Sequence, residues 1–235
     1  MRSLGKNVSA LLLLRRVVVV IASLGLIACT SSSGEPVKPL PEGQGGGGAA
    51  LDYPDGPYGT VAGATIPNYV FPGYARPAEG VGEGERRDLF TADFYNPTGD
   101  GVFDAGSPYG EGTAKPKALM LNVSALWCGP CKEEAKDVLP EEYSKHGPNG
   151  LEILVVIVDG AEQGVVANFD DLELWIGAFS VNYPAGIDPK TQLGAVFDPN
   201  SFPGNMIIDT TTMRIVEVIA GKPGDSFWLK LEDLL

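Results

Sequence analysis

Cys128 and Cys131 are the residues of this chain whose types and spacing are best suited to chemistry. Only Gly129 and Pro130 separate them, and Trp127 precedes them. Two cysteines at this spacing, between a strand and a helix, are typical of redox-active thiols. Thiol–disulfide exchange needs one thiolate that attacks and a second thiol that resolves the mixed disulfide. The pair therefore predicts dithiol–disulfide exchange without an organic cofactor, because the cysteines themselves carry the electrons.

The elements that must position the pair are a strand and a helix. Residues 118–126 form an apolar run that predicts a buried strand, and the spacing of apolar residues over 132–139 predicts a helix. At a helix N-terminus, unpaired N–H groups and the helix dipole lower the pKa of a thiol. We therefore expect Cys128 to be the exposed nucleophile and Cys131 to be the more buried resolving thiol. The intervening glycine lets a substrate chain approach, and the proline fixes the first turn where its missing N–H costs little.

The rest of the C-terminal half alternates in the same way. A β-branched run at 151–158 predicts a buried, parallel strand. Further predicted elements are a helix at 165–179, an extended segment at 181–188, a hairpin at 205–209 and 213–219, and a helix at 224–235. The helix after the cysteines is expected to stop or kink near Pro140. This order predicts an α/β sandwich with a central mixed β-sheet flanked by helices.

The preceding segment, residues 51–116, is rich in Gly, Pro, Tyr and Asp and predicts an irregular extension with short strands. These are expected at 67–71, 88–95 and 102–103. Oxygen-bearing side chains between Asn96 and Asp104 raise the alternative of a calcium loop. A calcium loop needs more carboxylates at fixed spacing and a late bidentate acid, so the pattern favours a plain turn.

The first 28 residues carry basic side chains, no acidic ones, and an apolar stretch too short for a comfortable membrane span. This is typical of a secretory signal, with an uncleaved anchor as the alternative. The signal ends at Cys29 in a sequence that resembles a bacterial lipobox, which implies that Cys29 carries lipid unless it is a chance cysteine. Acyl chains would hold the protein on a membrane, and residues 29–50 would form a flexible tether. Thr30, in place of an aspartate, favours the outer over the inner membrane by the same resemblance.

The charge and the cysteine count narrow the function further. The formal net charge of −13 disfavours nucleic-acid binding. If Cys29 of the three cysteines carries lipid, none is left for a structural disulfide. In an exported chain this favours redox chemistry for the remaining pair. A zinc site needs four ligands, and the chain offers only His146 beyond the pair, so we expect no metal. His146 is expected in a turn at 146–150, without a role.

Three features together resemble the thioredoxin fold, and more closely its membrane-attached TlpA/ResA branch. They are the Trp-Cys-Gly-Pro-Cys-Lys motif, Asn122 six residues before the first cysteine, and Phe202-Pro203 before an Ile-Ile strand. The resemblance spans residues 117–235, with a looser match over 60–104. It implies a thioredoxin-like domain at 51–235 whose core is 117–235.

The resemblance also implies roles for individual residues. Pro203 is expected to follow a cis peptide and to face the cysteines, with an ordinary trans proline as the alternative. Glu134 is expected beside the active site, where it would manage the proton of Cys131; the alternative is a solvated helix glutamate. Asn122 is expected to be buried beneath Cys131, and Trp127 to pack beside the disulfide.

Three positions depart from the family pattern. Residues 124–126 lack the usual aromatic side chains, and Pro140 lies later than the typical helix proline. Gly204 follows Pro203 where threonine is common, which is expected to widen the substrate groove.

These observations predict an extracytoplasmic, lipid-anchored thiol–disulfide oxidoreductase of the bacterial envelope. Its partners would be exported protein thiols and disulfides. By resemblance, reduction is the expected direction, and it would require a membrane electron donor. The alternative is a thioredoxin-fold lipoprotein that binds partners or Cu(I) without turnover.

Overall fold

The computed structural model describes residues 53–193, 197 and 201–235. The expected signal, the expected lipid site at Cys29 and the expected tether lie outside these residues.

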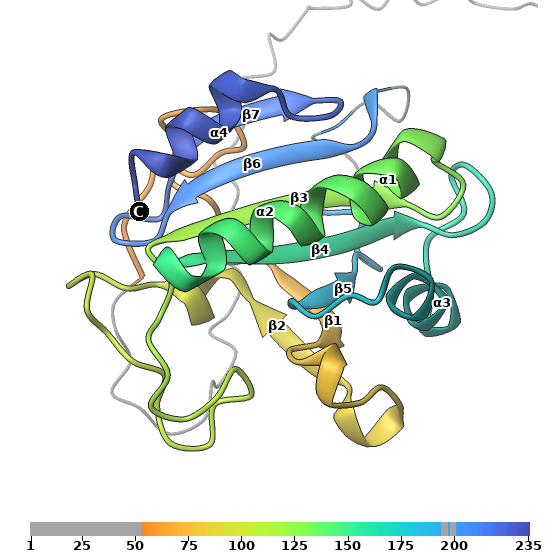
Figure 1. Ribbon diagram of the computed structural model, residues 1–235, viewed down its shortest axis with the longest axis horizontal. Coiled ribbons are helices and arrows are strands. Elements are labelled where there is room, and N and C mark those ends of the chain that lie inside the picture. The colour runs from red at the N-terminus through yellow and green to blue at the C-terminus, as the bar shows by residue number, and fades with distance from the viewer. Residues whose placement is uncertain (1–52, 194–196, 198–200) are drawn as a thin grey trace, which may run out of the picture. The chain divides into compact units, whose positions relative to one another are not determined.

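A seven-stranded mixed sheet organises the described residues (Figure 1). An interior strand, β3 (Ala118–Ala125), is buried along its whole length, runs parallel to β4 (Leu151–Asp159) and pairs antiparallel with β6 (Gly204–Asp209). The order is β2-β1-β5-β4-β3-β6-β7, where the remaining strands are β1 (Val70–Tyr74), β2 (Arg87–Phe90), β5 (Ala185–Ile187) and β7 (Arg214–Ala220). The predicted mixed α/β sheet, the parallel strand and the hairpin β6–β7 are confirmed.

The helix that follows the cysteines was expected to stop or kink near Pro140; it does not stop, and a π-helical turn interrupts its regular α-helical path directly before the proline. It consists of α1 (Gly129–Glu133), a π-helical turn (Glu134–Val138) and α2 (Leu139–His146). A proline inside a helix lacks an N–H and crowds the preceding turn. The chain accommodates Pro140 by widening the turn before it, where the Leu139 N–H bonds to the carbonyl of Glu134. His146 consequently ends α2 and does not lie in a turn.

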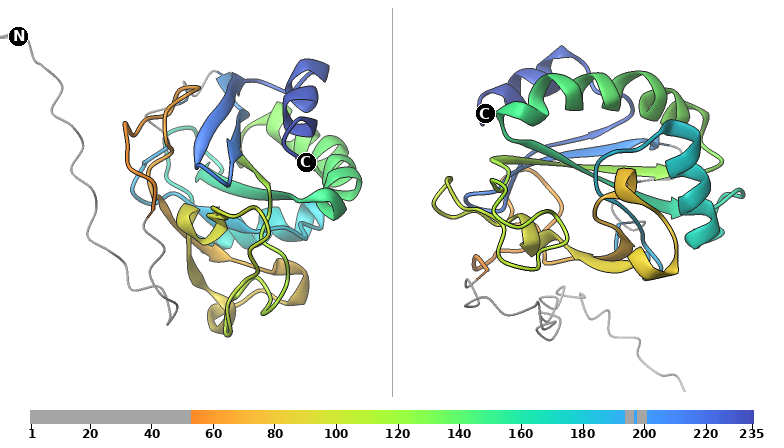
Figure 2. Two further views of the ribbon diagram at one scale, coloured as in Figure 1. Left: turned by 90° about the vertical axis from the view of Figure 1, so that its left-hand side faces the viewer. Right: turned by 60° about the horizontal axis from the view of Figure 1, so that its bottom comes forward.

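The other two helices differ from prediction mainly at their ends. α3 (Phe169–Phe179) starts four residues later than the apolar pattern indicates, because Asn168 caps it. The Asn168 side chain accepts from the N–H groups of Asp170 and Asp171, and the Asp171 side chain accepts from the Asn168 N–H. α4 (Asp225–Glu232) lies beside α2 on one face of the sheet, and residues 53–66 lie on the other side (Figure 2).

The N-terminal extension is part of the sheet. Its strands β1 and β2 pair with each other, and β1 pairs with β5. The expected strand at 88–95 turns into a 3-10 helix after Phe90, and the expected strand at 102–103 is a single bridge between Val102 and Ala114. These pairings extend the sheet that carries the cysteine motif.

The turn that raised the calcium alternative is closed by Asn96. Its side-chain oxygen accepts from the Gly101 N–H at 2.9 Å, and its amide donates to the Pro116 carbonyl at 3.1 Å. Within the described part of the chain, no group of three or more His, Cys, Asp or Glu side chains is arranged to hold a metal ion. The amide therefore serves the turn itself.

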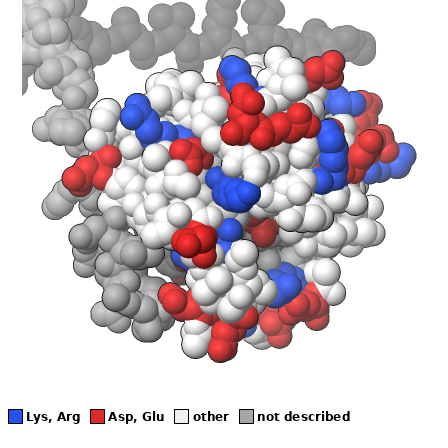
Figure 3. Space-filling view, turned by 60° about the vertical axis from the view of Figure 1, so that its left-hand side comes forward, with Lys and Arg blue, Asp and Glu red and all other residues white. Residues whose placement is uncertain are grey.

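No helix within the described ranges is long and apolar enough to cross a membrane. On the face drawn in Figure 3, lysine and arginine side chains lie beside aspartate and glutamate and do not gather into a basic patch.

Candidate active site

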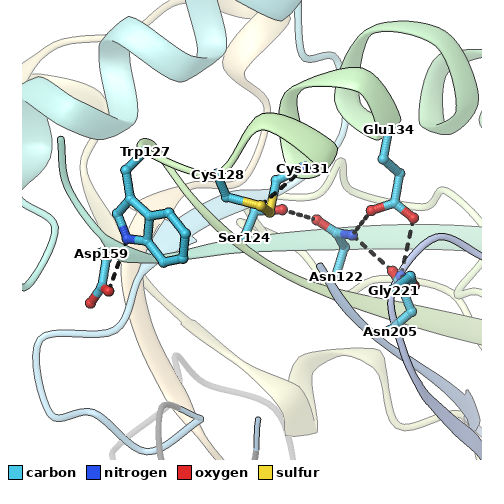
Figure 4. The surroundings of a disulfide bond; sticks show 9 residues. All are labelled: Asn122, Ser124, Trp127, Cys128, Cys131, Glu134, Asp159, Asn205 and Gly221. Atoms are coloured by element: carbon cyan, nitrogen blue, oxygen red, sulfur yellow. Dashed lines mark hydrogen bonds between the residues drawn. A yellow bond between two sulfur atoms is a disulfide. The ribbon is translucent and has the colours of Figure 1, made fainter. Parts of the chain in front are cut away.

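The two cysteines form a disulfide at the start of α1 (Figure 4). Their Cα atoms lie 5.3 Å apart, and Cys128 is the N-cap residue of the helix. The Cys131 N–H donates to the Sγ atom of Cys128 at 3.2 Å. The same N–H would stabilise a thiolate on Cys128 in the reduced form, because a helix N-terminus favours negative charge.

Cys128 is less exposed than predicted. The residue is 2% exposed and Cys131 is fully buried, whereas Gly129 and Pro130 between them are exposed. The disulfide draws the Cys128 side chain back over the first helical turn toward its buried partner. The prediction of an exposed Cys128 is therefore wrong for the oxidised form, and the exposed part of the motif is its central Gly-Pro.

Trp127 connects the motif to the end of the neighbouring strand. Its indole N–H donates to Oδ2 of Asp159 at 3.1 Å, and the same oxygen accepts from the Gly164 N–H at 2.8 Å. Asp159 thereby fixes both the tryptophan and the loop before α3. The sequence analysis did not single out Asp159; its position at the carboxyl end of the strand beside β3 was the available signal.

The peptide bond between Phe202 and Pro203 is cis, as predicted. It precedes β6, which pairs with β3, and the ring of Phe202 lies 6.0 Å from the ring of Trp127. Pro203 also accepts a hydrogen bond from the Gly221 N–H at 2.7 Å. The cis-proline segment thus lies next to the tryptophan of the cysteine motif.

The space beside Gly204 is filled, so the expected widening of a groove there is wrong. A Cβ atom at this position would lie 2.5 Å from a ring carbon of Phe197. The phenylalanine ring, itself buried, packs against the glycine backbone. The missing side chain of Gly204 makes room for this ring.

Glu134 lies in a fully buried network behind the disulfide, so the solvated alternative is wrong. Asn122 donates to Oε2 of Glu134 at 2.8 Å, and Asn205 donates to Oε1 at 3.0 Å. Asn122 also donates to the Asn205 side-chain oxygen at 2.8 Å and accepts from Ser124 at 2.8 Å. Asn122 is buried, as the resemblance implied, and Figure 4 shows the network reaching from Ser124 to Gly221.

Asn205 is a member of this network that the sequence analysis missed. It lies directly opposite Asn122 in the antiparallel pairing of β6 with β3. The available signal was an amide in an otherwise apolar strand, directly after Pro203 and Gly204. Its contact with Asn122 depends on strand register, which the chain pattern alone did not define.

Burial raises the pKa of Glu134 to about 7, while the hydrogen bonds from Asn122 and Asn205 and the charge of Lys222 act in the opposite direction. The side chain can therefore gain or lose a proton near neutral pH. It follows Cys131 by three residues, about one turn along the same helix. This arrangement suits a group that exchanges a proton with the resolving thiol.

His146 lies away from the disulfide, at the other end of α2. Its buried Nε2 atom is 3.2 Å from Oε2 of Glu142 and 3.6 Å from Oε1 of Glu232. The contact with Glu232 connects α2 with α4. The structure does not bring His146 to the cysteines.

A mixed sheet, a Cys-x-x-Cys disulfide at a helix N-terminus and an adjacent cis-proline define a protein with the thioredoxin fold. Solved structures agree with this class. The chain superimposes on a candidate thiol:disulfide interchange protein DsbE of Chlorobium tepidum with a TM-score of 0.52 and 16% identity, covering 74% of this chain and 99% of the other. A candidate protein disulfide isomerase of Bacteroides thetaiotaomicron gives 0.50 and 17%, covering 74% and 89%.

Among curated proteins, the chain is similar to the thiol-disulfide oxidoreductase ResA of Oceanobacillus iheyensis. The two are 38% identical over 105 residues, which are 45% of this chain and 50% of ResA. The match thus spans about half the length of that relative. No family model matches the chain. The fold expected from the sequence is confirmed, and so is the resemblance to ResA over the matched part.

Proposed function

We propose that this protein is a thiol–disulfide oxidoreductase that exchanges disulfides with other proteins through Cys128 and Cys131. The observation that carries this proposal is the disulfide at the N-terminus of α1, with a buried glutamate one turn further along the helix. The similarity to ResA supports the same activity.

The proposed reduction starts from the dithiol form. The Cys128 thiolate attacks one sulfur of a substrate disulfide, which forms a mixed disulfide and releases one substrate thiolate. Glu134 accepts the proton of Cys131, and the Cys131 thiolate then attacks Sγ of Cys128. This forms the intramolecular disulfide and releases the second substrate thiolate. Two electrons pass to the substrate, and each step is reversible.

The substrate chain is proposed to lie along the Phe202–Pro203 segment. This segment neighbours Trp127, whose partner Asp159 holds it in place. Backbone pairing with an extended polypeptide would present its cysteine to the disulfide without requiring a particular side chain. Such a mode suits a protein thiol or disulfide as substrate.

The location and direction are proposed from the sequence. A signal at 1–28 and a lipid on Cys29 would place the domain in the bacterial envelope, with the outer membrane favoured. There the chain would act on exported proteins, more often as a reductant, and a membrane electron donor would restore its dithiol.

The test is to trap the mixed disulfide in a full-length Cys131→Ser variant. We expect partners to accumulate on Cys128 and to be released by dithiothreitol, while a Cys128→Ser, Cys131→Ser double variant captures none. A single variant that captures nothing would contradict the exchange activity and favour a binding module or a Cu(I) chaperone. A strongly oxidising reduction potential, measured against a glutathione series, would contradict the reducing direction.

A further inference from the structure

Asn205 uses every polar atom of its side chain within the buried network. Its Oδ1 atom accepts from Asn122 at 2.8 Å. Its Nδ2 atom donates to Oε1 of Glu134 at 3.0 Å and to the Gly221 carbonyl at 3.2 Å. The side chain is fully buried, so no water can replace a lost partner without opening the core. The orientation of this amide is therefore fixed by three neighbours at once.

The same side chain is connected to the cis-proline segment. Gly221 accepts from Asn205 through its carbonyl and donates through its N–H to the Pro203 carbonyl at 2.7 Å. Asn205 itself follows Pro203 by two residues on β6. A continuous path of hydrogen bonds thus runs from the carboxyl group of Glu134 through Asn205 and Gly221 to Pro203.

The network favours the charged form of Glu134 over the protonated form. A carboxylate can accept at both oxygens, as it does here from two amides. A protonated carboxyl group carries an O–H on one oxygen, and each oxygen faces an N–H donor. A rotation of the Asn205 amide would not solve this conflict, because its oxygen would then face the Gly221 carbonyl. Protonation at Oε1 must therefore weaken the bond to Asn205.

We propose that Asn205 is a positioning residue that couples the charge of Glu134 to the Phe202–Pro203 segment. This inference rests on the proposed function, since that segment is the proposed site for the substrate chain. When Glu134 takes a proton from Cys131, Asn205 loses its charged hydrogen-bond partner. The hydrogen bond from Asn205 to the Gly221 carbonyl then changes as well. Occupation of the segment by a polypeptide acts in the reverse direction and changes the proton affinity of Glu134, because coupling between two sites is reciprocal.

Other groups that can carry charge near Glu134 also influence its proton affinity. They are Lys222, next to Gly221; Tyr183, whose buried hydroxyl has no hydrogen-bond partner in the described structure; and Cys131 on the same helix. None of these three lies in the hydrogen-bond path from Glu134 to Pro203. Asn122 contacts Glu134 but not Gly221, which makes it the matched control for Asn205.

The coupling can be measured without turnover, by following amide and carboxyl NMR signals of the oxidised protein against pH. In the native chain we expect the Gly221 and Gly204 amide signals to shift with the midpoint of the Glu134 carboxyl group. In Asn205→Leu this midpoint should rise by about one pH unit, a tenfold change in proton affinity, because a hydrogen bond to the charged form is lost. The amide signals should no longer follow it. Asn122→Leu should raise the midpoint similarly while the amides still follow it.

Kinetics give a second readout. Asn205→Leu should raise KM about three- to tenfold for a peptide disulfide, which uses the segment, relative to KM for a small aromatic disulfide, which does not. Asn122→Leu should leave this ratio near the native value. Equal ratios in the two variants, or amides that follow Glu134 in Asn205→Leu, would overturn the coupling. If Asn205→Leu does not fold, Asn205→Ser serves in its place. A chain without exchange activity would contradict the proposed function, but the NMR titration would still test the network.

Discussion

Two glutamates in this protein, the fully buried Glu134 and the partly buried Glu152, have the same displaced pKa but different surroundings. Burial is the largest cause in both cases and raises the pKa of Glu134 and of Glu152 to about 7. Glu134 accepts from two amides on two strands and lies one turn from Cys131 of the disulfide. Glu152 lies on β4, near the opposite end of the sheet, and accepts from the adjacent Ile153 N–H. Of the two, only Glu134 lies near the cysteines of the proposed reaction.

The difference teaches that a displaced pKa by itself does not identify a catalytic acid. Perturbed groups are enriched at active sites, but burial for structural reasons produces the same shift. The neighbours distinguish the two cases. Glu134 has a thiol nearby and a network fixed by Asn122 and Asn205, whereas Glu152 has the aromatic hydroxyl of Tyr143 and no cysteine.

The largest effect is expected from Cys128→Ser, which changes the site that contains Glu134. Without the attacking sulfur no mixed disulfide forms, so exchange with a protein disulfide should fall at least about 1000-fold. Glu152→Gln should retain exchange within twofold of the native rate. An insulin-reduction assay with dithiothreitol measures both. Comparable losses in the two variants would contradict the proposal that exchange takes place at the cysteines near Glu134 and not near Glu152.

The second effect separates the two glutamates directly. Glu134→Gln should lower the exchange rate about 10- to 100-fold at pH 7, because the Cys131 proton loses its acceptor. It should also flatten the pH profile between pH 6 and 8, where Glu134 titrates. Glu152→Gln should keep the native profile. Stopped-flow mixing with a peptide disulfide over this range provides the measurement, and a native-like profile in Glu134→Gln would remove its assigned role.

The third effect concerns stability and applies to Glu152. Folding raises its pKa from 4.5 to about 7, so the folded chain binds the proton more tightly than the unfolded chain. The free energy of unfolding is then highest below pH 4.5 and falls as the pH rises through about 7. Glu152→Gln removes this loss and should stabilise the protein by about 1–3 kcal/mol at pH 8 relative to the native chain, with the part-exposed side chain favouring the lower value.

Urea unfolding at pH 5 and pH 8 tests this third prediction. The variant and the native chain should differ more at pH 8 than at pH 5. Glu134→Gln should gain less, because a glutamine at this position would accept from one of the two asparagines but present its NH2 group to the donor of the other. An equal gain in both variants would show that the surroundings of Glu134 and of Glu152 contribute equally to the free energy of unfolding.

Sequence patterns predicted the parts of this fold that depend on short-range regularity. The apolar runs of β3 and β4, the β6–β7 hairpin and the junction at the cysteines follow from periodicity and from turn residues. The start of α3 did not, because the hydrophobic pattern begins before the capping residue Asn168. The path of the helix past Pro140 was missed as well, since a π-helical turn relieves the proline without ending the helix.

The residues of the candidate site also fall into a group that local sequence predicted and a group that depends on tertiary structure. The cysteines, Pro203, Asn122 and Glu134 were found through local motifs and through the family resemblance they carry. Asn205 and Asp159 were missed because their partners, Glu134 and Trp127, are far away in sequence and meet them only through the register of neighbouring strands. The burial of Cys128 depends on the disulfide geometry and on tertiary packing, which a helix N-terminus alone does not predict.

The smallest effect is expected when a polar contact is removed near one end of the cysteine helix, and the control removes one at the other end. Asp159→Ala removes the acceptor of the Trp127 indole N–H and of the Gly164 N–H. Losing these bonds should lower exchange about two- to tenfold and shift the tryptophan fluorescence, because Trp127 and the neighbouring Phe202 are no longer held together. Lys145→Ala removes an exposed ion pair with Glu232 at the other end and should change neither readout. Equal rates in the two variants would mean that the position of Trp127 does not affect how a substrate reaches the disulfide.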